Sequence, residues 1–256
     1  MTIKPPTAAI LIIGNEILSG RTQDVNIRFI AERLVARGIV LTEVRVVRDE
    51  ERAIIDAVHT LSKAFDMVFT TGGIGPTHDD ITADCMAKAF SMPLEINAEA
   101  KELMASYCQM RGVPLNEGRL RMARIPKGAA LIKNKVSAAP GFQIKNVYVL
   151  AGVPNIMRDM FDTIEASLPQ GETIYSHSVI SDLREGDIAL ELEDIQHQFP
   201  NVDIGSYPSM IDGKPSLSLV MRGSDPKALE KALSHVADMV KCQGKNPEIE
   251  RDMRIS

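Results

Sequence analysis

Residues 70–80 read TTGGIGPTHDD. An apolar run, Met67–Phe69, precedes this stretch, and residues 81–90 after it are predicted to form a helix. The stretch is therefore expected to be the loop between a buried strand and a helix. Its glycines leave room for backbone N–H groups to approach a phosphate closely, and the start of the helix also favours an anion. We expect a phosphate-binding loop at the carboxyl end of a strand, where open α/β sheets bind ligands.

The segments before this loop alternate between strand and helix patterns. Residues 8–13 form a continuous apolar run of strand length, and residues 39–47 are rich in β-branched residues. Between them, residues 27–34 carry apolar side chains at helical spacing, and a second such segment covers residues 54–61. This alternation predicts an α/β fold, in which helices cover both faces of a mostly parallel sheet as a three-layer α/β/α sandwich.

The pattern restarts near residue 169 as a β-α-β-β-α order, which predicts a small α+β domain of the split βαβ type. The expected segments are strands at 172–180, 202–206 and 216–221, and helices at 186–198 and 226–240. We therefore expect three parts, which are a larger domain at 1–168, a small α+β domain at 169–245 and a charged, mobile tail at 246–256.

The composition argues against several classes of protein. The 256 residues include 29 Lys and Arg against 34 Asp and Glu, a formal net charge of −5 without a basic tract, which argues against nucleic-acid binding. The cysteines, Cys85, Cys108 and Cys242, are odd in number and lack metal-binding spacing, which indicates a reducing, cytoplasmic compartment. The run 8–13 is too short to cross a membrane, and residues 1–7 lack the apolar region of a signal peptide.

Asp79 and Asp80 place two carboxylates beside the expected phosphate loop. They would repel a phosphate unless a cation lay between them, and hard oxygen ligands suit Mg²⁺ or a similar divalent ion. A metal ion that bridges carboxylate and diphosphate polarises the phosphorus and lowers the pKa of a bound water. The combination predicts metal-assisted phosphate chemistry, with Asp79 and Asp80 as metal ligands and catalytic residues. The alternative is a structural turn whose acidic residues only complement the dipole of the next helix.

Further polar residues are expected at the same edge of the sheet. Glu16, Asp24 and Asn26 follow the first strand, and the carboxyl ends of parallel strands meet at one edge. Glu16 or Asp24 could complete the metal shell, although Asp24 is equally suited to capping a helix. Thr77 could cap the helix after the loop. Asn116 could bind a base, a ribose or a pterin, or it could only cap the segment that follows it.

The loop and several other stretches together resemble one known family. Residues 71–82, TGGIGPTHDDIT, are similar to the hallmark of the molybdopterin-binding (MoaB/Mog-like) domain. The closer similarity is to the branch that contains the N-terminal domain of competence/damage-inducible protein A (CinA) and the molybdopterin-binding-like domain of FAD synthase. The C-terminal module from about residue 171 also resembles that of the CinA branch. Other matching stretches, in the family's order, are GNEILSG at 14–20, TQDVN at 22–26, NE at 116–117, APGF at 139–142 and GVPNIM at 152–157.

This resemblance implies an activity and a set of site residues. Molybdopterin-pathway members often carry Asp at the position of Asn15, and this difference favours the CinA-like branch. That branch implies a pyrophosphatase, dependent on Mg²⁺, Mn²⁺ or Co²⁺, that hydrolyses a nucleotide diphosphate such as ADP-ribose or FAD. The alternatives are a molybdopterin-binding protein of molybdenum cofactor biosynthesis and a non-catalytic nucleotide-binding module. The resemblance also implies a homo-oligomer, either a dimer or a trimer. Ligand-binding residues are expected at Gly14, Glu16, Asp24, Asn26, Thr71, Gly72, Gly73, Gly75, Pro76, Thr77, Asn116, Gly152 and Pro154.

Overall fold

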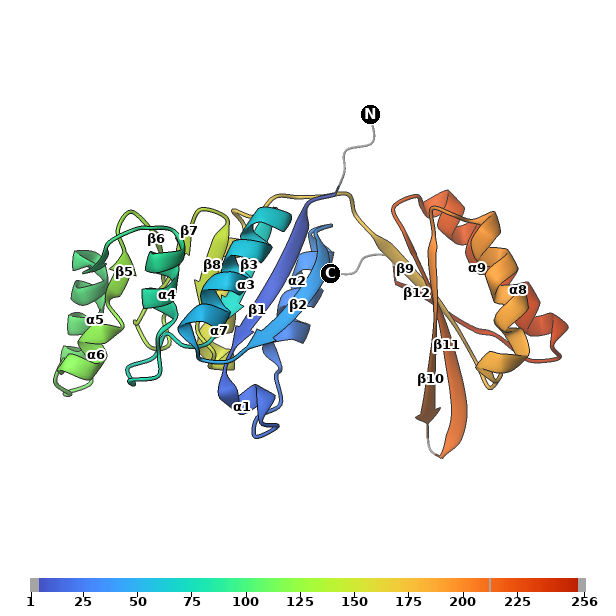
Figure 1. The fold of residues 1–256 in the computed structure, drawn as a ribbon. Helices are drawn as coiled ribbons and strands as arrows, with labels where there is room; N and C mark the ends of the chain where they lie inside the picture. Colours follow the sequence, from blue (N-terminus) through green and yellow to red (C-terminus); the bar gives the residue numbers. More distant parts are fainter. Residues whose placement is uncertain (1–4, 212, 253–256) are drawn as a thin grey trace. The chain divides into compact units, whose positions relative to one another are not determined.

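The computed structural model describes residues 5–211 and 213–252 and divides the chain into two compact units (Figure 1). One unit comprises Met1–Leu34 and Ile39–Gln170, and the other comprises Val35–Gly38 and Gly171–Ser256. Each unit has its own sheet and its own hydrophobic core. The first unit contains every residue that the sequence predicts at a functional site, so its sheet positions that site.

The sheet of the first unit has the strand order β2-β1-β3-β8-β7-β6. β2, β1, β3 and β8 run parallel, whereas β7 is antiparallel to β8 and β6 is antiparallel to β7. β1 and β3 are buried on both faces, which explains the apolar runs 8–13 and 67–69 in their sequences. The mostly parallel α/β sheet that the sequence predicts is confirmed. The strands are β1 Thr7–Ile13, β2 Val40–Val47, β3 Met67–Thr71, β6 Ala130–Ile132, β7 Gly141–Ile144 and β8 Val147–Leu150.

Helices cover both faces of this sheet and make the unit a three-layer α/β/α sandwich (Figure 1). α2 and α7 pack on one face, where Ile30 and Phe161 contact a core that includes Phe69 of β3. α3, α4 and α5 supply the core on the other face, and Ile54, Val58 and Leu61 of α3 have the helical spacing seen in the sequence. These helices are α2 Asn26–Ala36, α3 Glu51–Ala64, α4 Thr82–Ala89, α5 Ala98–Met110 and α7 Pro154–Glu165.

Several short elements of the first unit were not expected from the sequence. Each spans between three and five residues, which is too short to carry a helical or strand period. Two of them lie near the ends of the parallel strands. α1 directly follows β1, and Arg121 at the end of α6 lines a small pocket together with the glycine loop. The elements are α1 Asn15–Leu18, β4 Leu94–Ile96, α6 Glu117–Arg121 and β5 Arg124–Pro126.

The second unit is a small α+β domain whose antiparallel sheet has the strand order β10-β11-β9-β12. Leu229, Leu233 and Val236 of α9 are buried against Val179 of β9 and Leu219 of β11. The predicted β-α-β-β-α order is observed. β10 and β11 form a hairpin whose strands are longer than the sequence indicates. The elements are β9 Tyr175–Ser181, α8 Glu185–Gln198, β10 Asp203–Ile211, β11 Lys214–Gly223, α9 Pro226–Cys242 and β12 Glu248–Asp252.

The C-terminal segment differs from the expectation of a mobile tail at 246–256. Glu248–Asp252 form strand β12, which pairs antiparallel with β9. Arg251 Nη2 donates a hydrogen bond to Glu230 Oε1 of α9 at 2.8 Å, which ties the strand to the neighbouring helix. Charged residues predominate in this edge strand, so its sequence lacks the alternation that identifies a strand. Residues 253–256 lie outside the described residues.

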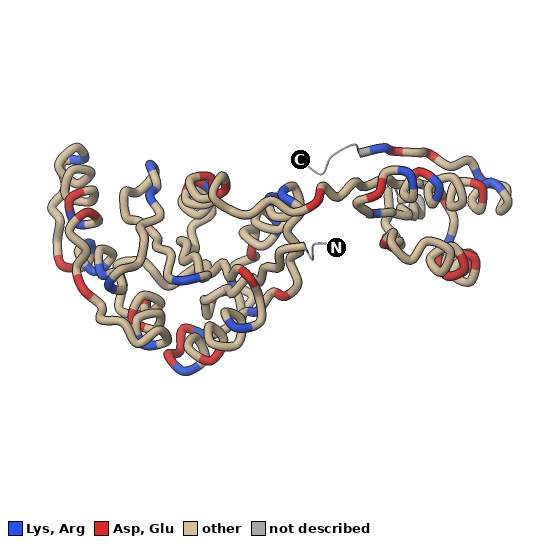
Figure 2. Tube along the Cα trace, turned by 90° about the horizontal axis from the view of Figure 1, so that it is seen from above, with Lys and Arg blue, Asp and Glu red and all other residues tan. Residues whose placement is uncertain are grey.

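Two further observations concern the helices and the charged residues of the chain. In the ranges that the structure describes, every helix is too short or too polar to span a lipid bilayer. Lys and Arg residues are interspersed with Asp and Glu along both units (Figure 2).

Candidate functional site

A cavity of about 530 Å³ lies at the carboxyl edge of the parallel strands in the first unit. Its wall includes Ile13 at the end of β1, and Gly72 and Ala151 directly after β3 and β8. The loops that follow these neighbouring parallel strands therefore lie together at one edge of the sheet, as in other open α/β sheets. Among the described residues, the charged side chains that line this cavity are all acidic, namely Glu16, Asp49, Asp79 and Asp80.

The glycine loop has a backbone conformation that other residues would strain. Gly72 and Gly73 have φ values of 103° and 65°. A β-carbon on Gly72 would lie 2.1 Å from the Ile13 carbonyl oxygen, and one on Gly73 would lie 2.2 Å from Thr82 Oγ1. The buried Thr82 closes the loop, because its Oγ1 donates to Gly72 O at 3.0 Å and its N–H donates to Gly73 O at 3.0 Å. Backbone atoms therefore form this part of the cavity wall.

Three consecutive N–H groups of the loop, on Gly73, Ile74 and Gly75, have no acceptor within the described residues. All three residues line the cavity. Successive free N–H groups in such a turn form a concave site that attracts anions. The loop can thus donate several hydrogen bonds to one phosphate group.

Thr77 holds the two carboxylates of the loop together. Its N–H donates to Asp80 Oδ2 at 2.8 Å, and its Oγ1 lies 2.6 Å from both Asp80 Oδ2 and Asp79 Oδ1. A hydroxyl has one proton, so Thr77 donates to only one of the two carboxylates at a time. The hydrogen bond from Thr77 is the main cause that lowers the pKa of Asp79, and the backbone N–H of Asp79 contributes in the same direction. Asp79 is therefore ionised at neutral pH.

This donor set fits a hard divalent cation that is shared with a ligand. Asp80 Oδ1 has no hydrogen-bond partner within the described ranges, because both contacts with Thr77 use Oδ2. No group of three or more His, Cys, Asp or Glu side chains in those ranges could hold a metal ion by itself. Mg²⁺ usually binds through one or two carboxylates and completes its shell with waters and substrate phosphates. Asp79 and Asp80 are thus the residues that can hold such an ion.

Two further carboxylates of the cavity come from the segments after β1 and β2. Glu16 of α1 folds back over Gly14, where a β-carbon would lie 2.5 Å from Glu16 Oε1. Asp49 Oδ2 accepts a hydrogen bond from the Asn15 N–H at 2.8 Å and thereby fixes the start of α1. Sequence reasoning missed Asp49, although its place just after a parallel strand could have identified it.

A smaller pocket of about 70 Å³ adjoins the cavity and shares Glu16 and Gly152 with it. Asn26, which lines this pocket, is only 4% exposed, and its Nδ2 donates to Gly152 O at 2.9 Å. Its Oδ1 is buried and has no hydrogen-bond partner in the described structure. Asp24 also lines the pocket, and its Oδ1 accepts from the Ile27 N–H at 2.8 Å, so the capping role is observed.

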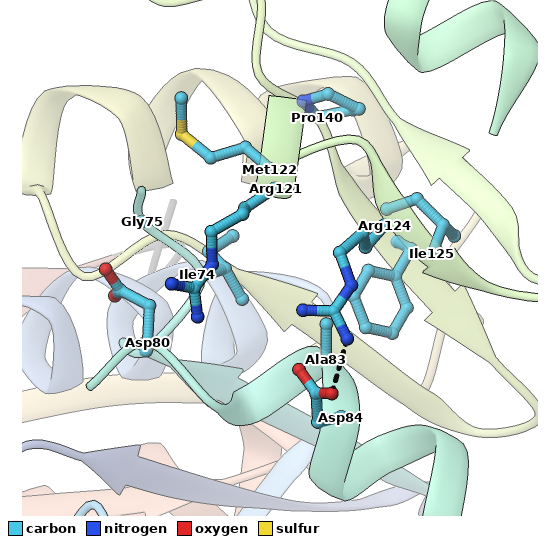
Figure 3. Close-up of a pocket in the computed structure, with 12 residues that line it drawn as sticks. Ile74, Gly75, Asp80, Ala83, Asp84, Arg121, Met122, Arg124, Ile125 and Pro140 are labelled. Atoms are coloured by element: carbon cyan, nitrogen blue, oxygen red, sulfur yellow. Dashed lines mark hydrogen bonds and ion pairs between the residues drawn. The ribbon is translucent and has the colours of Figure 1, made fainter. Parts of the chain in front are cut away.

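Arg121 of α6 is a basic residue beside the loop that sequence reasoning did not single out. It lines a small pocket together with Asp80 and the glycine loop. Figure 3 shows its guanidinium next to Ile74 and on the side of Asp80. Arg124, in the same pocket, donates to Asp84 Oδ1 at 2.6 Å, whereas Arg121 makes no hydrogen bond or ion pair within the described residues. Arg121 is therefore available to a ligand.

The structure brings most of the predicted site residues together. The missing side chain of Gly14 leaves room for the Glu16 carboxylate, and Thr77 is hydrogen-bonded to Asp79 and Asp80. Asn116 is not among the residues that line the cavity, and its Oδ1 caps α6 by accepting from the Arg119 N–H at 3.0 Å. The predicted residues that line the main cavity are Glu16, Gly72, Gly73, Gly75, Pro76, Asp79, Asp80, Gly152 and Pro154, and those that line only the smaller pocket are Asp24, Asn26 and Thr71.

Comparison with family models divides the chain in two. Residues 9–170 match the model of the probable molybdopterin binding domain. Residues 173–247 match the model of the middle domain of FAD synthase. The first match confirms the resemblance to the molybdopterin-binding domain family, and the second adds a similarity to FAD synthase for the C-terminal unit.

Similar proteins occur in archaea and animals. A protein of Archaeoglobus fulgidus is 33% identical over 234 residues, which are 90% of this chain and 96% of that protein. A probable FAD synthase of Caenorhabditis elegans is 31% identical over 258 residues, which are 91% of this chain and 50% of the relative. A crystal structure of CinA from Thermoplasma acidophilum, described as having unknown function, is 33% identical with a TM-score of 0.58 and covers 64% of this chain and 98% of its own.

Proposed function

Because the chain belongs to the probable molybdopterin binding domain family, with a second unit similar to the FAD synthase middle domain, we propose that it hydrolyses a nucleotide diphosphate. The proposed activity is that of a divalent-metal-dependent pyrophosphatase, and ADP-ribose and FAD are the substrates to test first. The observation that carries the proposal is the pairing of an acidic cavity with a loop of free N–H groups.

The charges of the cavity support a cation that arrives with the substrate. Its charged lining residues in the described ranges are acidic, yet Gly73, Ile74 and Gly75 offer donors suited to an anion. A diphosphate alone would meet repulsion from Asp79 and Asp80, and a divalent cation alone would leave the N–H groups unused. A complex of cation and diphosphate satisfies both groups, and Arg121 adds a positive charge beside them.

The proposed reaction is attack by water on one phosphorus of the diphosphate. The water oxygen forms a bond to that phosphorus, the bond to the bridging oxygen breaks, and the second phosphate leaves with the electron pair. A bound divalent cation lowers the pKa of water and neutralises the diphosphate. Asp79 and Asp80 hold the cation, and the glycine loop orients the phosphate. Glu16, whose carboxylate makes no hydrogen bond within the described residues, is placed to accept the proton from water.

The family supports a second candidate, a molybdopterin-binding protein of molybdenum cofactor biosynthesis, because its model covers residues 9–170. A nucleotide-binding module without catalysis is the third. If the protein binds molybdopterin in cofactor biosynthesis, it should restore molybdoenzyme activity in a strain that lacks the adenylyltransferase of that pathway. If it is a non-catalytic module, ADP-ribose or FAD should bind without turnover. The expected dimer or trimer and the cytoplasmic location stay predictions, which mass measurement in solution and fractionation test.

The experiment for the pyrophosphatase is AMP release from ADP-ribose and from FAD, with Mg²⁺, Mn²⁺ or Co²⁺ and with a chelator. We expect release only with a metal ion. Asp80→Asn should lower the rate about 100-fold or more, because the cation contributes several kcal/mol to transition-state stabilisation. Asp56→Asn is the matched control, since Asp56 lies on the surface of α3 beside Arg52, outside the cavity. Absence of AMP with every metal, or an Asp80→Asn variant as active as the wild type, would reject the proposal.

A further inference from the structure

Asn26 lines the smaller pocket, and its buried amide has an acceptor that no described residue uses. Its Nδ2 donates to Gly152 O at 2.9 Å. This bond fixes the orientation of the amide, because a carbonyl oxygen can only accept, and the reversed amide would place two acceptors against each other. Oδ1 therefore faces away from Gly152 with no partner in the described residues, at a side chain that is 4% exposed. A buried acceptor without a donor is costly, so a ligand that supplies one gains affinity.

The other polar side chains of this pocket can all accept hydrogen bonds. Glu16 and Asp24 contribute carboxylates, and the hydroxyls of Thr22 and Thr71 and the amide of Gln23 can accept or donate. The pocket holds about 70 Å³. One water requires only about 10–15 Å³ by the same measure, so the space admits a group larger than a single water. The lining thus selects a compact group with several hydrogen-bond donors.

The pocket opens beside the phosphate site, since Glu16, Gly72 and Gly152 line both hollows. A ligand whose phosphate lies on the glycine loop therefore brings the adjoining part of the molecule to Asn26. In a nucleotide that part is the sugar, and ribose presents neighbouring hydroxyl groups as donors. Recognition of a ribose hydroxyl by an acidic side chain is a common solution in nucleotide-binding α/β folds.

We propose that the pocket around Asn26 is a ribose subsite, in which Asn26 Oδ1 accepts a hydrogen bond from a sugar hydroxyl and Asp24, which lines this pocket alone, accepts from its neighbour. This inference rests on the proposed function, because it requires a nucleotide as the ligand. The site then recognises the ribose of the substrate rather than its base. The substrates are then ribonucleotides, and the deoxy forms are discriminated against.

The first test compares ligands on the unchanged protein. Binding of AMP, 2′-deoxy-AMP and 3′-deoxy-AMP is measured by calorimetry in the presence of Mg²⁺. We expect at least one deoxy analogue to bind about 10- to 100-fold more weakly, because it leaves the buried acceptor without a donor. Equal affinities for the three nucleotides would overturn the proposal. The donor to Asn26 Oδ1 would then be a water molecule rather than a sugar hydroxyl.

The second test uses Asn26→Ala and the ratio of AMP to deoxy-AMP affinity. The ratio should fall to nearly one, because the variant lacks the discriminating acceptor. Asn97→Ala is the control, since Asn97 also begins a helix of this unit, caps α5 through the Ala100 N–H at 3.0 Å, and should keep the wild-type ratio. Partial unfolding lowers the affinity of all nucleotides alike and leaves the ratio unchanged. An Asn26→Ala variant that retains the wild-type ratio would also overturn the proposal.

Failure of the subsite and failure of the pyrophosphatase give different results. Metal-dependent AMP release without discrimination between ribose and deoxyribose rejects the subsite alone. Discrimination in binding without any AMP release supports the subsite and rejects the pyrophosphatase. A protein that binds none of the nucleotides, with or without Mg²⁺, rejects both.

Discussion

Gly75 and Asp80 are packed so closely that a β-carbon on Gly75 would lie 2.6 Å from Asp80 Oδ2. That oxygen is the one that accepts hydrogen bonds from the N–H and the Oγ1 of Thr77. The absence of a side chain at position 75 therefore gives the Asp80 carboxylate its place beside the loop. Gly75 does not have the positive φ of Gly72 and Gly73, so the requirement for glycine here is one of space.

Gly75→Ala should displace the Asp80 carboxylate while it leaves the fold intact. We expect the affinity for Mn²⁺ or Mg²⁺, measured with a nucleotide diphosphate present, to fall about 10- to 100-fold, as it does when groups that orient metal ligands are lost. Gly118→Ala on α6 is the matched control, because a β-carbon there meets its nearest atom at 3.6 Å, an ordinary contact. Equal metal affinities in both variants would contradict the assigned role of Asp80.

Thr77→Val should raise the pH below which the protein loses its metal ion. Thr77 lowers the pKa of Asp79 from its ordinary value of 3.8, so Asp79 stays ionised to lower pH than a free aspartate. Metal binding by the wild type is thus lost only as the pH falls through the lowered pKa. In Thr77→Val the pKa returns toward 3.8, and binding is lost earlier during acidification.

Titration of Mn²⁺ binding across the acidic range measures this shift. Thr77→Ser retains the hydroxyl and should behave as the wild type. Because Asp79 is exposed, we expect the effect in metal binding rather than in the free energy of unfolding. If Thr77→Val and Thr77→Ser lose Mn²⁺ at the same pH, the Thr77 hydroxyl does not control the ionisation of Asp79.

Arg121→Ala should weaken binding of the diphosphate without changing the metal requirement. We expect an increase of about tenfold in the Kd of ADP-ribose, in line with one hydrogen bond from a partly exposed charged group to a phosphate. Arg119→Ala is the control, because Arg119 lies on the same helix but donates to the Pro114 carbonyl oxygen at 2.6 Å. The role of Arg121 is excluded if both variants bind ADP-ribose equally.

The parts of the site that the sequence predicts are those encoded in one continuous stretch. The glycine loop follows a buried strand, and Asp79 and Asp80 stand beside it in the sequence, so their proximity needs no tertiary information. The position of Glu16 followed from one further rule, that parallel strands end at the same edge of a sheet. The layers of the fold were predicted for a similar reason, since buried strands and amphipathic helices have periods visible in short windows.

The parts that the sequence does not predict depend on packing between distant segments. Arg119, Arg121 and Arg124 lie within six positions of one another and look equivalent in the sequence. Only the fold assigns Arg119 to a carbonyl oxygen, Arg124 to Asp84 and Arg121 to the loop. The free oxygen of Asn26 is likewise a tertiary property, because it arises from the contact with Gly152, 126 positions away.

Cysteine reactivity tests whether water or a thiol attacks the substrate. Cys85 of α4 lies in the core close to the loop, and burial raises its pKa to about 12. Its thiolate is therefore scarce at neutral pH, and a thiol-specific reagent should modify the exposed Cys242 quickly but reach Cys85 and the buried Cys108 only after unfolding.

Cys85→Ala should accordingly retain metal-dependent AMP release, with the free energy of unfolding lowered by about 1–2 kcal/mol for the small cavity left in the core. Cys242→Ala should change neither quantity, because Cys242 is exposed in the second unit. Thermal unfolding and the AMP assay on the same samples separate stability from catalysis. If Cys85→Ala remains folded but releases no AMP, the reaction proceeds through the thiol, and the water that Glu16 is proposed to deprotonate is not the nucleophile.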